Sequence, residues 1–199
     1  MRAQKGTFGY IRAGRKQTTA VTAVLLFLTL TLFFTGLFVY GSNRSVFSIL
    51  AAVMALPTAV SAVRCVMFYR AVPCSREMYE RIRAVSGGLY CMYDLCLTSK
   101  EANYNIACAC VLFDRIACLT EDSALRIADA EKHIRLQIAL SKYHDCFITV
   151  TGDPEVFLTL IEEMEEIRKE RGADPYAEEQ AWVPGTRQTM AGVLKSISL

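Results

Sequence analysis

Acidic residues are missing from the first 76 positions of this 199-residue chain, although the same stretch contains nine lysines and arginines. All twenty aspartates and glutamates come after it, against thirteen basic residues, so the two parts carry formal charges of +9 and −7. A protein that coats nucleic acid needs a basic excess in its folded part to bind phosphates. The acidic second part excludes that class, and we expect no nucleic-acid partner.

Charge of either sign is missing from residues 17–43 and again from residues 45–63. Within the first gap, residues 19–40 form one apolar run, and a helix of that length spans the roughly 30 Å hydrocarbon core of a bilayer. The second run is also long enough, and it extends through Phe68 if Arg64 reaches toward the head groups. Both runs are longer than the apolar core of a signal peptide. The sequence therefore predicts two uncleaved transmembrane helices.

Only residues 41–44 join the two runs, which predicts an antiparallel helical hairpin. Five lysines and arginines precede the first run, five follow the second, and the turn holds Arg44 alone. Because cytoplasmic segments carry the excess of basic residues, we expect a multi-pass protein of the cell membrane with both termini in the cytoplasm. The eight cysteines agree, since thiols stay reduced there. An anionic inner leaflet is the expected lipid partner.

Small residues recur along the second run and would let another helix approach closely. The approaching helix is either the first helix of the same chain or a second copy, so a homo-oligomer stays open. The predicted helix-packing residues are Ser48, Ala51, Ala52, Ala55 and Ala59.

After the second run, apolar residues alternate or recur at helical spacing over short segments. The segments predict an α+β domain with the order α-β-β-β-α-β-α and a mostly antiparallel sheet. Asp153 before Pro154 is the clearest helix start. The expected elements are a helix over 75–85, strands over 89–98, 105–113 and 116–120, a helix over 129–143 beginning at a cap on Asp129, a strand over 146–151 and a helix from 154.

Two strand patterns carry a further expectation. The run 105–113 is continuously apolar, which is typical of a strand covered on both faces. The run 89–98 alternates, which places Leu89, Cys91, Tyr93, Leu95 and Leu97 on one face.

The predicted parts of the chain are a basic N-terminus (1–17), a two-helix transmembrane hairpin (18–69), a cytoplasmic α+β domain (74–171), and a polar linker with a C-terminal tail (172–199) whose end is either helix or strand.

The order of elements over residues 75–151 resembles the core of the restriction-endonuclease-like family. That resemblance implies a carboxylate on one strand and an acid-x-Lys pair on the next, which together bind a divalent metal and activate water. Two residues after Asp114 and Glu121, however, the chain has Ile116 and Ser123 instead of lysine. An enzyme alternative therefore stays open only as a degenerate, membrane-tethered metal-dependent hydrolase. Its matching positions are Asp94 or Asp114, followed by Glu121 or Asp122.

Cysteines offer a second possible metal site. Cys108 and Cys110 share one face of a strand, and Cys118 could lie on a neighbouring strand. Thiolates bind zinc, but zinc sites more often use CxxC turns, so buried packing is the competing interpretation. The sequence contains no GxGxxG, phosphate loop, GxSxG or HExxH motif, and we expect no cofactor.

The opening KGTFGYIRAGRKQT and the later run YDLCLTSKEANYNIACACVLFDRIACLTED resemble an uncharacterised group of small two-pass bacterial membrane proteins. The resemblance covers nearly the whole chain and implies no activity. From the residues, we expect a non-enzymatic binding or scaffolding domain held at the inner membrane face, for a protein partner or a second copy of the chain. The enzyme alternative would use Asp94, Asp114 and Glu121.

Overall fold

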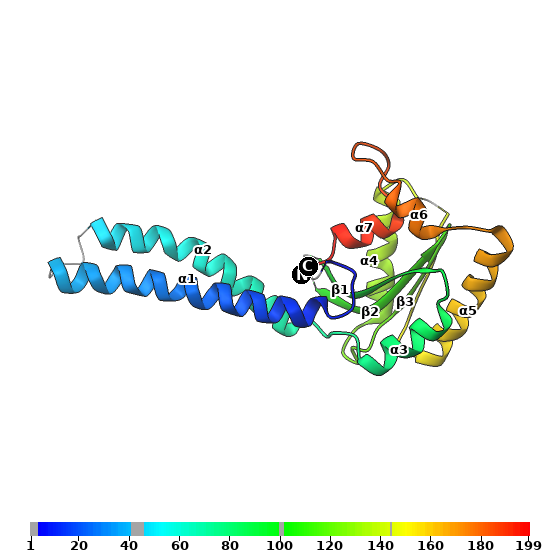
Figure 1. Cartoon of the computed structure of the whole chain (residues 1–199), viewed down its shortest axis with the longest axis horizontal. Helices are drawn as coiled ribbons and strands as arrows, with labels where there is room; N and C mark the ends of the chain where they lie inside the picture. Colours follow the sequence, from blue (N-terminus) through cyan, green and yellow to red (C-terminus); the bar gives the residue numbers. More distant parts are fainter. Residues whose placement is uncertain (1–3, 41–45, 100–101, 144) are drawn as a thin grey trace. The chain divides into compact units, whose positions relative to one another are not determined.

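The computed structural model describes residues 4–40, 46–99, 102–143 and 145–199. These residues form two compact units (Figure 1). One is Ile11–Arg70, and the other combines the chain up to Tyr10 with Ala71–Leu199. The predicted turn at residues 41–44 lies outside the described residues, as do two residues of the loop between the first two predicted strands.

Two long apolar helices, α1 (Tyr10–Tyr40) and α2 (Val46–Arg70), make up the first unit. Both are long and apolar enough to cross a membrane. Their apolar side chains are mostly exposed, with Phe38 at 82% and Leu56 at 70%, whereas the core helix of a soluble protein buries such side chains. α1 begins nine residues before the predicted start at residue 19, because the preceding Arg, Lys and Gln residues favour helix and no proline interrupts them.

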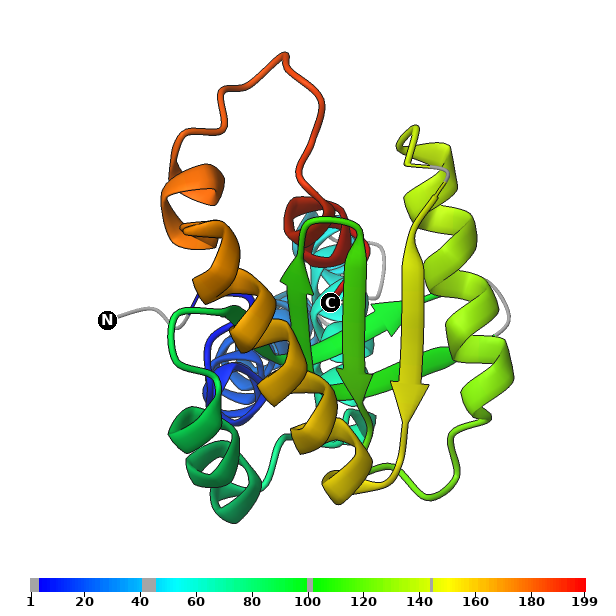
Figure 2. The same cartoon turned by 90° about the vertical axis from the view of Figure 1, so that its right-hand side faces the viewer.

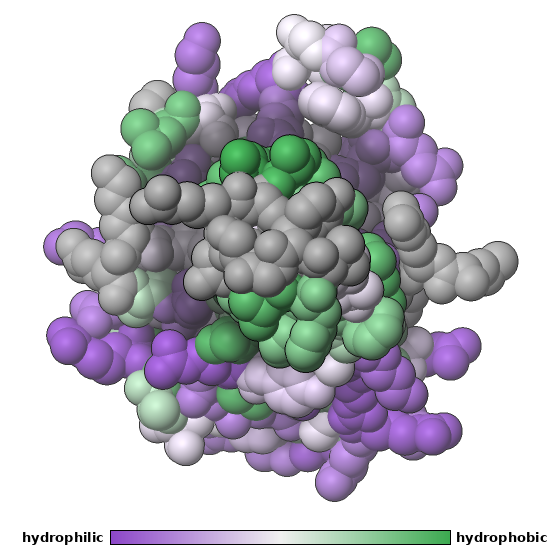
Figure 3. Space-filling model, turned by 90° about the vertical axis from the view of Figure 1, so that its left-hand side faces the viewer, coloured by the Kyte–Doolittle hydropathy of each residue, from purple (hydrophilic) through white to green (hydrophobic). Residues whose placement is uncertain are grey.

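Hydroxyl groups join the two helices. The Oγ1 atom of Thr22 lies 2.8 Å from Oγ of Ser61, and the Oγ1 atoms of Thr29 and Thr58 lie 3.0 Å apart. Hydroxyl pairs of this kind hold helices together in lipid, where apolar contact alone gives no preference for protein over acyl chain. Figure 3 shows the hydrophobic side chains gathered on the helical pair, against hydrophilic ones over most of the other surface in that view.

The predicted small-residue ridge of α2 is divided between two faces. Ala51 is buried and Ser48 is half-buried. Ala52, Ala55 and Ala59 are exposed. Helical rotation explains the division, since Ala51 lies seven residues from the buried Thr58 and so shares its face, which the other alanines do not.

The second unit is a small α+β domain with a mixed four-stranded sheet. The strand order is β1-β2-β3-β4, in which β1–β2 and β2–β3 are antiparallel and β3–β4 is parallel. Figure 2 shows α5 crossing one face of the sheet. The elements are α3 (Arg76–Val85), β1 (Tyr90–Thr98), β2 (Asn103–Leu112), β3 (Arg115–Leu119), α4 (Ile127–Leu140), β4 (Phe147–Thr151), α5 (Pro154–Arg171), α6 (Pro175–Gln180) and α7 (Met190–Ser196).

Helices cover both faces of the sheet. On one face, α3 and α5 pack through Ile82, Phe157 and Ile161, all fully buried. On the other, α4 and α7 pack through Ile134 and Leu194. β2 is buried along nearly its whole length, which confirms the prediction of a strand covered on both sides.

Side-chain caps define the starts of α3, α5, α6 and α7. Ser75 caps α3 and accepts a hydrogen bond from the backbone N–H of Met78, and Asp153 caps α5 by accepting from Glu155. The predicted start at Asp153 is confirmed. The predicted cap at Asp129 is wrong: α4 begins two residues earlier and Asp129 lies in its first turn.

The alternation predicted for β1 breaks at Asp94, where the backbone has a φ of 55°. Before that residue, Leu89 and Cys91 pack with α3 and α5; after it, Leu95 and Leu97 pack with α4 and α7. A left-handed residue changes the direction of the following side chains, which a strict two-residue period does not allow. The prediction that these residues share one face is therefore wrong beyond Asp94.

Both ends of the chain contribute to the domain. Gly6 forms a β-bridge with Tyr93, and Ser198 forms one with Leu97, so each chain end pairs with β1. The 172–199 region, predicted as a linker and tail, includes α7, which is largely buried. The tail is thus a helix followed by one bridging residue. The bridge satisfies backbone groups of β1, which lies at the edge of the sheet and lacks a further strand as partner.

Candidate functional site

Two of the three carboxylates of the enzyme alternative meet at the start of α3. Asp94 Oδ1 accepts a hydrogen bond from the backbone N–H of Cys74 at 2.7 Å. Glu121 accepts two, from the backbone N–H and the hydroxyl of Ser75, each at 2.7 Å. Carboxylates stabilise the partly positive N-terminal end of a helix, so their contacts have a structural role there.

Asp114 lies away from this pair. It precedes β3, whereas Glu121 follows that strand, and five strand residues lie between them. At about 3.3 Å per residue, the two backbones are roughly 20 Å apart. One divalent ion cannot contact all three carboxylates, so the predicted set of Asp94, Asp114 and Glu121 is not brought together.

The cysteines predicted as weak metal ligands are also divided. Cys108 and Cys110 lie on one face of β2 with their sulfurs 3.9 Å apart. Cys118 pairs with Ala109 in the β2–β3 register, which places it on the opposite face. In its place, Cys91 of β1 lies opposite Cys110 and is joined to it by a disulfide. The expectation that the cysteines stay reduced is wrong for this pair, because the strand register places the two side chains directly opposite each other.

Burial suppresses the reactivity of the Cys108 and Cys118 thiols. Burial raises the pKa of Cys118 to about 12 and, together with the nearby Cys74, raises the pKa of Cys108 well above its usual range. The thiolate is the reactive form, so these groups are poor nucleophiles at neutral pH.

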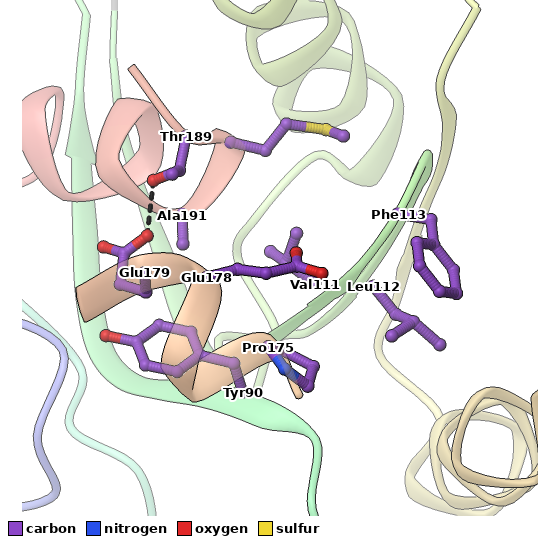
Figure 4. Close-up of a pocket in the computed structure, with 10 residues that line it drawn as sticks. Tyr90, Val111, Leu112, Phe113, Pro175, Glu178, Glu179, Thr189 and Ala191 are labelled. Atoms are coloured by element: carbon purple, nitrogen blue, oxygen red, sulfur yellow. Dashed lines mark hydrogen bonds between the residues drawn. The ribbon is translucent and has the colours of Figure 1, made fainter. Parts of the chain in front are cut away.

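A pocket opens where α6 and α7 meet the sheet (Figure 4). Its cavity volume is about 80 Å³, and Val111, Leu112 and Ala191 supply apolar lining. Glu178 of α6 is exposed and extends across the pocket toward Val111 in Figure 4. Within the described residues Glu178 forms no ion pair, whereas the neighbouring Glu179 is paired with Lys195, so Glu178 supplies the unpaired charge of this pocket.

A half-buried polar network forms one wall of the pocket. Lys195 Nζ donates hydrogen bonds to Tyr90 OH at 2.5 Å and to Glu179 Oε1 at 2.8 Å. Thr189 donates to the second oxygen of Glu179. Burial opposes the charge on Lys195, but the hydrogen bonds to Glu179 and Tyr90 outweigh it and raise the pKa of the ammonium group. The wall is therefore fixed in place with its charges paired.

A second hollow, of about 300 Å³, shares Glu179 and Thr189 with the pocket. Trp182 and Gln188 line its outer part. Sequence reasoning missed both hollows, because the pocket combines β1 and β2 with two short helices far along the chain, and the second hollow lies between those helices. The only available signal was the N-cap pattern of Asp174 before Pro175, which matches that of Asp153 before Pro154.

Comparison with protein-family models, curated proteins and solved structures finds no match to this chain.

Proposed function

We propose that this chain is a two-pass protein of the cell membrane whose α+β domain binds a protein partner at the cytoplasmic face. The domain acts as a binding or scaffolding module and not as an enzyme. The observation that carries the proposal is the pocket between α6, α7 and the sheet, with an apolar lining, a rigid polar wall and the exposed carboxylate of Glu178.

The size and charge of the pocket favour a side chain of a protein as its occupant. Pockets for drug-sized ligands run to roughly 300–1,000 Å³, well above the 80 Å³ found here. The stem of a lysine or arginine packs on apolar surface while its head seeks an acceptor, and Glu178 offers one. The partner is thus expected to insert a basic side chain.

Contacts between the two chain ends support the proposed topology. Lys5 Nζ donates to the carbonyl oxygen of Ser198 at 2.7 Å, and Tyr10 OH donates to that of Leu199 at 3.1 Å. Segments that bond to each other must lie on the same side of a membrane, so the chain between them crosses an even number of times. The distribution of basic residues then favours the cytoplasm for both ends.

Site-specific photo-crosslinking tests the pocket. A photoreactive residue at Gln180, exposed on α6, should give a discrete crosslinked product in native membranes. Glu178→Lys should abolish that product, whereas Glu163→Lys, the same charge change on the exposed face of α5, should leave it. A crosslink between two copies would identify self-association as the binding event. Equal loss in both variants would contradict the pocket as the binding surface.

Reporter fusions test the topology. A reporter active only in the cytoplasm should be active when fused at the C-terminus and inactive when inserted at residue 43. An active exported reporter at the C-terminus would contradict the proposal.

Basic residues at the start of α1 would lie beside the inner leaflet. Arg12, Arg15 and Lys16 belong to its first turns, and each basic residue near an anionic surface contributes about 1 kcal/mol of attraction. A peptide of residues 1–17 should bind anionic vesicles, and salt at about 1 M should release it, because the Debye length then shrinks to about 3 Å. Binding that salt does not change would contradict this electrostatic contact.

A further inference from the structure

Three cysteine sulfurs gather on the face of the sheet that α3 and α5 cover. The Sγ atoms of Cys91, Cys108 and Cys110 all lie within 4.8 Å of one another. Cys108 and Cys110 are fully buried and Cys91 is half-buried, so the group has one side open to solvent.

The backbone of two paired strands fixes this arrangement. Cys91 lies directly opposite Cys110 in the β1–β2 register, with their Cα atoms 4.3 Å apart. Cys108 lies two residues from Cys110 on the same strand, and residues two apart share a face. All three sulfurs are therefore positioned by sheet hydrogen bonds and not by a mobile loop.

The spacing of the Cys108 and Cys110 sulfurs matches that of two thiolates around one metal ion. At a zinc–sulfur distance of about 2.3 Å and a tetrahedral angle, two sulfurs on one ion lie about 3.8 Å apart. The Cys108 and Cys110 sulfurs are 3.9 Å apart. Three sulfurs would supply three of the four ligands of a tetrahedral ion.

We propose that the reduced Cys91, Cys108 and Cys110 form a binding site for one thiophilic divalent ion, with zinc as the natural candidate. The structure joins Cys91 to Cys110, and a dithiol reductant supplies the two electrons and two protons that convert this disulfide to two thiols. Binding of the ion then releases the three thiol protons to solvent. Soft thiolate ligands select such an ion over magnesium or calcium. The inference is independent of the proposed function.

Cobalt provides the direct test, because its thiolate complexes absorb in the near ultraviolet. The full-length protein in mild detergent, reduced and then freed of reductant without oxygen, should bind one Co²⁺ per chain with thiolate-to-cobalt bands, and Zn²⁺ should displace it. Cys110→Ser should lower the Co²⁺ affinity at least tenfold. Cys118→Ser is the matched control, since Cys118 is equally buried but lies on the other face of the sheet; it should bind as the native chain does.

Alkylation of the unmodified chain covers the case in which Cys110→Ser does not fold. Zn²⁺ should protect Cys91 from alkylation at least tenfold and leave Cys146, which is also half-buried, unprotected. The proposal is overturned if the reduced chain binds no stoichiometric Co²⁺, or if Cys118→Ser abolishes binding as fully as Cys110→Ser does. Equal alkylation of Cys91 with and without Zn²⁺ overturns it as well.

Discussion

The two compact units differ in which side chains are exposed and which are buried. In the domain, apolar side chains such as Phe157 are buried and most charged ones are exposed. In the helical pair, Phe27 and Phe38 are exposed, while the hydroxyls of Thr29 and Thr58 face each other. The hydrophobic effect thus selects the core of the domain. In the lipid that we propose for the helical pair, that effect cannot select a helix partner, and close packing and hydrogen bonds would do so.

The largest expected effect compares two phenylalanines. Phe157→Ala should lower the free energy of unfolding by about 3–5 kcal/mol, because it leaves a cavity between α5 and the sheet. Phe38→Ala, at 82% exposure on α1, should change it by less than about 0.5 kcal/mol. Denaturant titration in mild detergent, followed by circular dichroism, measures both. Similar losses would mean that α1 buries Phe38 against protein.

A buried ion pair and an exposed ion pair give a second comparison, within the domain. Glu165, 5% exposed, receives two hydrogen bonds from Arg168 and one from the backbone N–H of Gly88. Glu165→Gln should cost about 2 kcal/mol of unfolding free energy. The exposed pair of Glu131 with Arg135 is the control, and Glu131→Gln should cost about 0.3–0.5 kcal/mol. Equal costs would contradict the role of burial.

The same carboxylate predicts a pH dependence. The hydrogen bonds from Arg168, reinforced by that from Gly88, outweigh burial and lower the pKa of Glu165. A lowered folded pKa gives stability that is complete above the unfolded value of about 4.3 and is lost as pH falls through the folded value. The stability gap between the native chain and Glu165→Gln should therefore close between neutral pH and strong acid. A gap that widens on acidification would contradict it.

Apart from the control variants, the smallest effect belongs to a hydroxyl pair between the two long helices. Thr58→Val removes one hydroxyl of the Thr29 pair and should cost about 0.6 kcal/mol, since hydrogen bonds between membrane helices are weak on average. A double-mutant cycle with Thr29→Val, measured by unfolding in mixed detergent, isolates the pair. A coupling above about 2 kcal/mol would show that the hydroxyls contribute as much as a domain ion pair.

Several elements could be predicted because their signals are local. The apolar runs predicted two long helices, and Asp153 with Pro154 predicted the start of α5. Gly172, at a φ of 61°, ends that helix in the left-handed conformation that glycine favours. Each signal lies within one helical turn or one span of the residues that it governs, so no knowledge of the rest of the fold was needed.

Other features depend on residues far apart in the chain. Only the register of β1 against β2 places Cys91 beside Cys110, and only the register of β2 against β3 sends Cys118 to the other face. The pocket of Glu178 likewise needs α6 to meet β1. Alternation gives a residue one of two faces but not its partner on the next strand, so these positions followed only from the assembled sheet.

The sequence by itself determined the two long apolar helices, the charge difference between the two parts and the helix-strand order of the domain, because composition and short-range periodicity encode them. Tertiary structure alone decided that both chain ends pair with β1, that Asp94 and Glu121 support α3, and that three sulfurs meet on one face. The reason is physical: a backbone group or carboxylate forms a hydrogen bond with whichever partner the completed fold brings within about 3 Å. No local pattern of residues specifies that partner.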